Sequence, residues 1–126
     1  PLLKDAIYRN GGDEFVAILG GEGVTKANIQ NLAGFILARF KKPWILGFGQ
    51  VICSTSIGVA CFPEDGRTAE ELLRCADMAM YQVKKSGGGG TCFGYQLQNG
   101  NITLKKEQNS CKWSNGGEPN GNRTKL

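Results

Sequence analysis

A glycine pair between two short apolar segments constrains the fold of this chain more than any other feature. The segments, residues 6–8 and 15–19, lie on either side of Asn10-Gly11-Gly12. This arrangement predicts a β-hairpin, because a tight two-residue turn needs positive φ at both central positions. We therefore expect Asp13 and Glu14 at or just past the hairpin tip. Paired carboxylates there suit Mg²⁺, which takes oxygen ligands and usually shares itself with substrate phosphates, although ordinary turn composition is the alternative interpretation.

Two segments have the apolar period of amphipathic helices. From residue 24, apolar residues recur at spacings of three and four until Lys41-Lys42-Pro43 stops the helix. A second helix begins at a capping box formed by Thr68 and Glu71. We expect it to bury Leu72, Leu73, Ala76, Ala79, Met80 and Val83, and to expose Arg74, Asp77, Tyr81 and Lys84.

Between the two helices the period changes to that of strands. Residues 44–46 and 51–53 flank a glycine-containing bend, which predicts a hairpin whose second strand continues to residue 61. One face of that strand carries only Ser54, Ser56, Gly58 and Ala60. Such a face admits a helix or a ligand at close range, and we favour helix packing.

Four glycines at residues 87–90 follow the second helix, and residues 91–95 read as a final strand. We interpret the glycines as a helix C-cap and a flexible loop. A phosphate cradle is the alternative, but a P-loop leads into a helix and this run leaves one. The predicted order is therefore β-β-α-β-β-α-β, an α+β arrangement with the helices on one face of the sheet.

Charge and cysteine content exclude several classes of function. Residues 1–98 carry 10 basic and 9 acidic groups, so this part is nearly neutral and does not suggest a nucleic-acid partner. Five cysteines without a C-x-x-C pair, in a chain with no histidine, argue against a zinc site and favour a reducing, cytoplasmic location. No apolar run is long enough to span a membrane. The chain begins at Pro1 and we expect it to be a piece of a longer protein.

Three sequence blocks carry a resemblance to a known family. Gly11-Gly12-Asp13-Glu14-Phe15, with Arg9 two residues ahead, resembles the signature of the GGDEF family, the diguanylate cyclases. Residues 56–60 and 76–81 follow in the order and at about the spacing of that family. The resemblance covers about residues 2 to 97 and implies a palm-like (ferredoxin-like) antiparallel sheet with helices.

The resemblance also implies how the chain is divided. The family's first strand and first two helices precede the hairpin and have no counterpart here, so residues 1–98 correspond to the C-terminal two-thirds of a GGDEF domain. Residues 99–126 form a polar, basic tail, which we expect to be largely disordered because it has few apolar anchors.

Chemistry follows from the resemblance position by position. The family joins two GTP molecules into cyclic di-GMP, each bound by one of two facing domains. In that pattern Asp13 binds Mg²⁺ (or Mn²⁺) and helps deprotonate the attacking hydroxyl, while Glu14 supports the metal site. Gly11 and Gly12 correspond to the turn where the nucleotide approaches, and Lys84 to a lysine that contacts its phosphates.

Departures from the pattern predict that this chain alone is inactive. The aspartate-rich first strand, which supplies another metal carboxylate, and the guanine-reading residues have no counterpart. Gly88 stands where the family has the arginine of Gly-Arg-Asn, and Leu2 replaces the arginine of the R-x-x-D product site, although Asp5 matches. The alternative functions are a degenerate nucleotide-binding or regulatory module and a protein-interaction module. A homodimer is expected, because uncovered apolar side chains would otherwise form a large exposed patch. The alternative is that the tail folds back over this patch.

Overall fold

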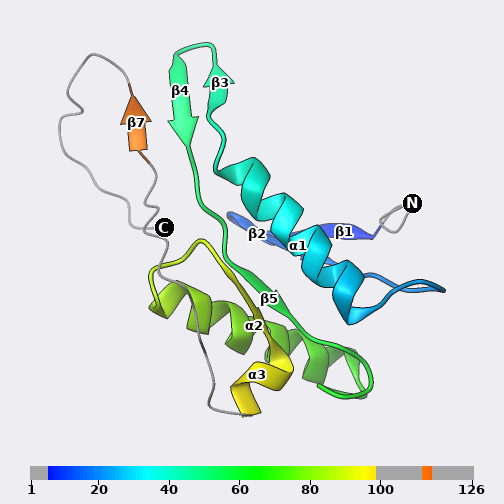
Figure 1. The fold of residues 1–126 in the computed structure, drawn as a ribbon. Helices are drawn as coiled ribbons and strands as arrows, with labels where there is room; N and C mark the ends of the chain where they lie inside the picture. Colours follow the sequence, from blue (N-terminus) through cyan, green and yellow to red (C-terminus); the bar gives the residue numbers. More distant parts are fainter. Residues whose placement is uncertain (1–5, 99–111, 115–126) are drawn as a thin grey trace. The chain divides into compact units, whose positions relative to one another are not determined.

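The computed structural model describes residues 6–98 and 112–114 (Figure 1). Its contacts divide the chain into two compact units, one ending at Phe35 and the other beginning at Ile36. The boundary falls inside helix α1 (Lys26–Phe40). This helix confirms the first one predicted from the sequence. Within the described residues, every helix falls short of the length and apolarity that a membrane crossing requires.

The first unit contains the predicted hairpin. Strands β1 (Ile7–Gly11) and β2 (Glu14–Ala17) pair antiparallel, with Ile7 opposite Ala17 and a bulge between Arg9 and Gly11. Helix α1 follows a loop, and the Thr25 hydroxyl accepts a hydrogen bond of 3.2 Å from the Asn28 N–H. Thr25 therefore satisfies one of the N–H groups that the first turn of a helix leaves without a partner.

A three-stranded antiparallel sheet forms one part of the second unit. Strands β3 (Trp44–Leu46) and β4 (Gly49–Ile52) make the predicted hairpin. Strand β7 (Lys112–Ser114) pairs with the other edge of β4. These three residues belong to the predicted tail, and the remainder of that tail lies outside the described residues.

The predicted strand from residue 51 to residue 61 is wrong as a single element. It ends with β4, and β5 (Ile57–Val59) pairs instead with β6 (Thr91–Phe93) in a separate sheet. This pair is parallel, which corrects the expectation of an antiparallel sheet throughout. Parallel strands need a long crossover connection, and α2 (Ala69–Lys85) provides it.

The last predicted strand is also shorter than expected. Strand β6 ends at Phe93, and residues 94–98 form the short helix α3 (Gly94–Gln98). The Phe93 N–H donates a hydrogen bond of 2.7 Å to the Gln96 side-chain oxygen, which fixes this bend. The α+β class is confirmed, and the described residues form three small sheets in place of one.

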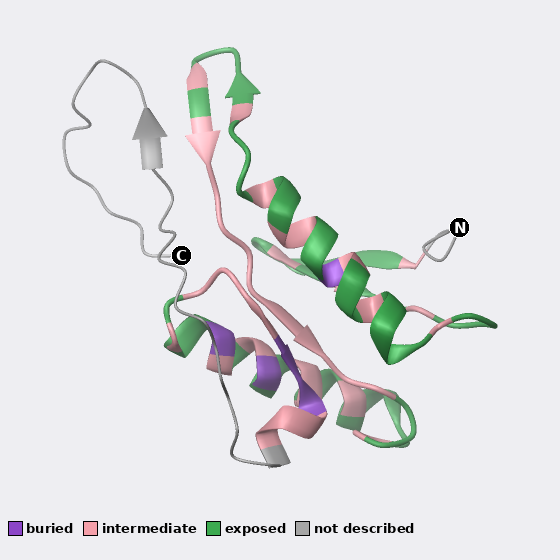
Figure 2. Ribbon diagram, in the orientation of Figure 1, coloured by how far each residue is buried: buried purple, intermediate pink, exposed green. Residues whose placement is uncertain are grey.

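Helix α2 packs on β5 and β6 and forms the core of the second unit (Figure 2). Ala79, Val83 and Cys92 are fully buried there. Gly58 confirms the predicted close approach: a Cβ on it would lie 2.6 Å from the Met80 backbone nitrogen and closer still to the Ala76 carbonyl oxygen.

The prediction that Leu73 is buried is wrong, since its side chain is 48% exposed. Leu73, Asp77 and Tyr81 are spaced by four residues along α2, so they share one stripe of the helix. Asp77 and Tyr81 are exposed as predicted. The face that contacts β5 and β6 lies about a quarter-turn away, and Leu73 is therefore at the edge of the packed surface.

The capping box of α2 forms as predicted. The Thr68 hydroxyl accepts a hydrogen bond from the Glu71 N–H, and the Glu71 carboxylate accepts one from the Thr68 N–H, both of 3.2 Å. We expect Thr68→Ala to lower the free energy of unfolding by about 1 kcal/mol, because the Glu71 N–H loses its partner. Chemical denaturation at pH 7 measures the change, and equal stability of the two proteins would contradict it.

The contribution of Glu71 to this cap depends on pH. Hydrogen bonds from the backbone N–H groups of Arg67 and Thr68 lower the pKa of Glu71 below its ordinary value of 4.5. Its contribution is therefore complete above pH 4.5 and is lost as the pH falls through the lowered pKa. The stability difference between the wild type and Glu71→Gln should shrink in that acid range.

Candidate functional site

The hairpin tip presents two carboxylates side by side in the sequence. Gly11 pairs with Glu14, so Gly12 and Asp13 form the turn between the strands. Asp13 is exposed in that turn, and Glu14 is half-buried at the start of β2. The prediction that both acids lie at or just past the tip is confirmed. The bulge between Arg9 and Gly11 moves the turn beyond the predicted Asn-Gly pair.

Backbone conformation explains the two glycines at the tip. Gly11 has φ +124° and Gly12 has φ +55°, values that L side chains rarely adopt. A Cβ on either glycine would meet no atom within 4 Å. The Arg9 Nε donates a hydrogen bond of 3.0 Å to the Gly12 carbonyl, which holds the turn. Both glycines therefore leave the tip open, and a bulky anion has room to approach the backbone.

We expect Gly11→Ala to destabilise the hairpin by about 1–3 kcal/mol, because alanine pays the full cost of this conformation. Hydrogen exchange of the Ile18 amide, which donates to the Ala6 carbonyl at the open end of the hairpin, measures local opening. Gly34→Ala is the matched control, since Gly34 lies in α1 with open space around it. The control should exchange no faster than the wild type, and equal rates for Gly11→Ala and the wild type would contradict the prediction.

The tip supplies ligands that suit a hard divalent cation, but it supplies only a few. Asp13 and Glu14 offer carboxylate oxygens, which Mg²⁺ prefers. In the part of the chain that the structure describes, no group of three histidine, cysteine or acidic side chains is placed to hold a metal ion. A cation at the tip would therefore take its remaining ligands from water or from the phosphates of a bound nucleotide.

Lys84, the predicted phosphate contact, lies elsewhere in the chain. It is exposed in the last turn of α2, within the second unit, whereas the hairpin belongs to the first. The structure therefore brings Gly11, Gly12, Asp13 and Glu14 together, and a contact of Lys84 with the same nucleotide stays a prediction.

The glycine run after Lys84 ends the helix, as predicted. The N–H groups of Gly87 and Gly88 donate to the carbonyls of Lys84 and Val83, at 3.1 and 2.9 Å. Gly87, Gly88 and Gly89 all have positive φ, so the chain reverses direction without a side chain at these positions.

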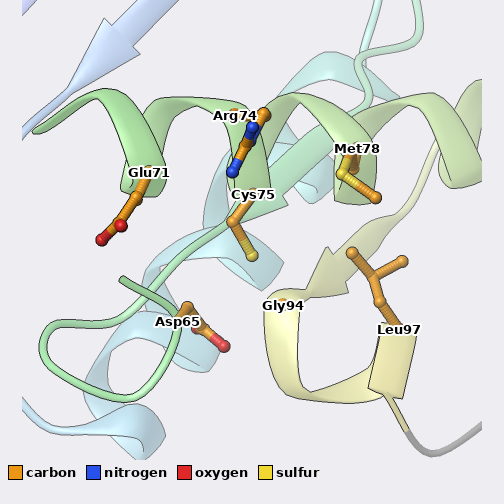
Figure 3. Close-up of a pocket in the computed structure, with 7 residues that line it drawn as sticks. All are labelled: Asp65, Glu71, Arg74, Cys75, Met78, Gly94 and Leu97. Atoms are coloured by element: carbon orange, nitrogen blue, oxygen red, sulfur yellow. The ribbon is translucent and has the colours of Figure 1, made fainter. Parts of the chain in front are cut away.

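The second unit also has a cavity that sequence reasoning did not find. It lies beside α2 and α3, and its volume is about 310 Å³ (Figure 3). Its lining residues are Asp65, Glu71, Arg74, Cys75, Met78, Gly94 and Leu97. Burial and the nearby Asp65 carboxylate raise the pKa of Cys75, which keeps its thiol neutral. Residues 63–66 have ordinary turn composition, and no local signal in the sequence indicates a cavity.

Comparison with known families and curated proteins gives one consistent answer. The sequence pattern of the family described as "Diguanylate cyclase, GGDEF domain" matches residues 2–89. The bifunctional diguanylate cyclase/cyclic di-GMP phosphodiesterase MucR of Pseudomonas aeruginosa is 40% identical over 98 residues, 78% of this chain and 14% of MucR. The diguanylate cyclase TpbB of the same species is 38% identical over 87 residues, 68% of this chain and 20% of TpbB. The chain thus spans a small part of these relatives.

Solved structures give the same result for the fold. The GGDEF domain of TpbB from Pseudomonas aeruginosa matches with a TM-score of 0.65 and 35% identity, over 69% of this chain and 54% of that one. An EAL/GGDEF domain protein from M. capsulatus matches with a TM-score of 0.62 and 38% identity, over 73% and 60%. The palm-like arrangement expected from the sequence is therefore confirmed at the level of the fold.

Proposed function

Because this chain belongs to the GGDEF family of diguanylate cyclases, we propose that it is part of a domain that condenses two GTP molecules into cyclic di-GMP in bacterial signalling. The observation that carries the proposal is the hairpin tip. Two carboxylates stand beside two glycines. Both glycines have a positive φ that L side chains rarely adopt, and they leave the tip open. Such a tip admits the triphosphate of a nucleotide together with a divalent cation.

Each residue at the tip has a proposed role. Asp13 and Glu14 hold Mg²⁺, or Mn²⁺ in its place, and Asp13 accepts the proton of the attacking 3′-hydroxyl. The cation, when bound, neutralises phosphate charge and makes the attacking hydroxyl group more acidic. Gly11 and Gly12 let the phosphates approach the backbone, and Lys84 contacts phosphate from the end of α2.

The reaction requires a partner copy and a supply of GTP. Each domain holds one nucleotide, so we propose that two copies face each other as a homodimer. Large apolar side chains on the surface support association: Phe15, Ile18 and Phe35 are 63%, 61% and 71% exposed. Since GTP is a cytoplasmic metabolite, the proposed site of action is the cytoplasm.

We expect the 126-residue chain to bind nucleotide weakly and to make no cyclic di-GMP by itself. Two carboxylates and a lysine hold a metal–triphosphate through charge, without preference for the base. Calorimetric titration with GTP and with ATP, each with and without Mg²⁺, should give equal, metal-dependent binding. Absence of metal-dependent binding would overturn the proposed function, and clear selectivity for GTP would contradict the predicted lack of a guanine pocket.

Turnover is measured separately, by chromatography of the chain incubated with GTP and either Mg²⁺ or Mn²⁺. An active diguanylate cyclase serves as the positive control. Product that forms with the wild type and disappears with Asp13→Ala would contradict the prediction of inactivity and would support the proposed roles of the tip.

A second candidate function is a regulatory, nucleotide-binding module without turnover. Two observations favour it. Gly88 stands where the family has an arginine, which removes one phosphate contact. Other similar proteins carry the name of the opposite activity: the cyclic di-GMP phosphodiesterase PdeR of Escherichia coli is 36% identical over 86 residues. In this module the tip still binds a metal–triphosphate. Both functions predict no product from this chain alone, so only product that forms with the wild type and disappears with Asp13→Ala would exclude the regulatory module.

A further inference from the structure

The cavity beside α2 lies wholly in the second unit, and the proposed cyclase chemistry does not use it. Arg74, Cys75 and Met78 reach it from neighbouring turns of α2, while Leu97 reaches it from α3 (Figure 3). Asp65 closes it from the loop that precedes α2. A volume of about 310 Å³ is at the lower end of the range for sites that enclose small organic molecules.

One residue that lines the cavity has an acceptor without a donor. The Asp65 Oδ2 accepts a hydrogen bond of 2.7 Å from the Cys61 N–H. The other oxygen, Oδ1, is buried and has no hydrogen-bond partner among the described residues. The Asp65 carboxyl and the Cys75 sulfur both crowd Gly94, where a Cβ would lie 2.7 Å from Oδ1 and 2.5 Å from Sγ. Leaving such an oxygen unpaired is costly, and a positively charged donor removes that cost.

A guanidinium group also lies beside the cavity. Arg74 is exposed beside the cavity, and within the described part of the chain its guanidinium has no hydrogen-bond partner. The Glu71 carboxylate attracts Arg74 electrostatically, and it accepts the N–H groups of Arg67 and Thr68 on its Oε2 atom. Glu71 and Arg74 are both exposed, so their attraction is weak and a ligand can replace it. Arg74 can therefore bind a carboxylate from outside, and guanidinium groups bind carboxylates with two parallel hydrogen bonds.

One side of the cavity is apolar. The Met78 thioether and the Leu97 side chain face each other across the cavity (Figure 3). Methionine adapts to ligands of different shape, because its side chain is unbranched and polarisable. The cavity thus offers a carboxylate, a guanidinium and an apolar side within the volume of one small molecule.

From this arrangement we propose that the cavity binds a free amino acid with an apolar side chain. Its ammonium group donates to Asp65 after the Cys75 thiol turns aside, its carboxylate binds Arg74, and its side chain packs on Met78 and Leu97. This site would give the domain a small-molecule input that is separate from the hairpin. The proposal does not rest on the proposed function, and either can fail without the other.

The test is calorimetric titration of the full 126-residue chain with three probes of similar shape. L-Leucine carries both charges, leucinamide lacks the carboxylate, and 4-methylpentanoate lacks the ammonium group. We expect leucine to bind, and each analogue to bind at least about tenfold more weakly, because each leaves one charged group of the protein unpaired. No binding of leucine at millimolar concentration, or equal binding of all three probes, would overturn the proposal.

Two protein variants test whether Arg74 binds the carboxylate of the ligand, and neither variant changes a core residue. Arg74→Gln should weaken leucine at least about tenfold and leave leucinamide unchanged, since only leucine uses the guanidinium. Arg67→Gln is the matched control, because Arg67 is exposed, lies outside the lining and contributes only its backbone N–H to Glu71. Equal loss of leucine binding in both variants would show that general charge, and not this site, attracts the ligand.

Discussion

Gly58→Ala is expected to abolish the cooperative folding of the second unit. The new Cβ would lie 2.6 Å from the Met80 backbone nitrogen and closer still to the Ala76 carbonyl oxygen. These are main-chain atoms of α2, so no side-chain rotation relieves the overlap. The helix would have to leave β5, which would open the core around Ala79 and Val83.

The expected loss exceeds about 3 kcal/mol, which is a large part of the total stability of a small domain. Thermal denaturation followed by circular dichroism measures it. Gly47→Ala is the matched control, because Gly47 lies in the turn between β3 and β4, where a Cβ would meet no atom within 4 Å. A cooperative transition of Gly58→Ala near the wild-type temperature would contradict the packing of α2 on β5.

Gly58 also illustrates how far the sequence predicts this fold. Its place on a face of small residues indicated a helix at close range, and the structure confirms that helix as α2. The period of α2 and its capping box are local signals, and both were predicted correctly. The break between β4 and β5 was not, because β5 pairs with β6, more than 30 residues later in the chain. The alternation of apolar and small side chains in residues 51–61 does not indicate such a distant pairing.

The second large effect is expected at the hairpin tip. Replacing Asp13 by Asn and Glu14 by Gln in one protein keeps the size of both side chains and removes both negative charges. We expect this double variant to lose metal-dependent binding of GTP by at least about tenfold, because neutral amides are poor ligands for a hard cation. Calorimetric titration with GTP and Mg²⁺ measures the loss.

A matched control separates the two acids at the tip from general charge. Glu22→Gln removes an exposed carboxylate from the loop after β2, within the same unit. It should bind the nucleotide as the wild type does. If the double variant bound GTP and Mg²⁺ as tightly as Glu22→Gln, the proposed metal site at the tip would be wrong.

Sequence reasoning located the tip more easily than the cavity, for a physical reason. Gly11, Gly12, Asp13 and Glu14 are consecutive, so one turn brings them together, and only the bulge after Arg9 shifted the turn from its predicted position. The cavity instead joins a loop, two turns of α2 and a short helix after β6. Its residues meet only because α2 packs on β5 and β6, and spacing along the chain does not indicate that.

The most direct test of the metal site at the hairpin is paramagnetic broadening by Mn²⁺, which takes the same oxygen ligands as Mg²⁺. Small amounts of Mn²⁺ are added to the ¹⁵N-labelled chain in the presence of GTP, and the amide signals are followed by nuclear magnetic resonance. The proposed site predicts that the signals of Gly11, Gly12, Asp13 and Glu14 broaden first and stay sharp in the double variant. Earlier broadening at another carboxylate, such as Asp65 or Asp77, with the tip unaffected, would contradict it.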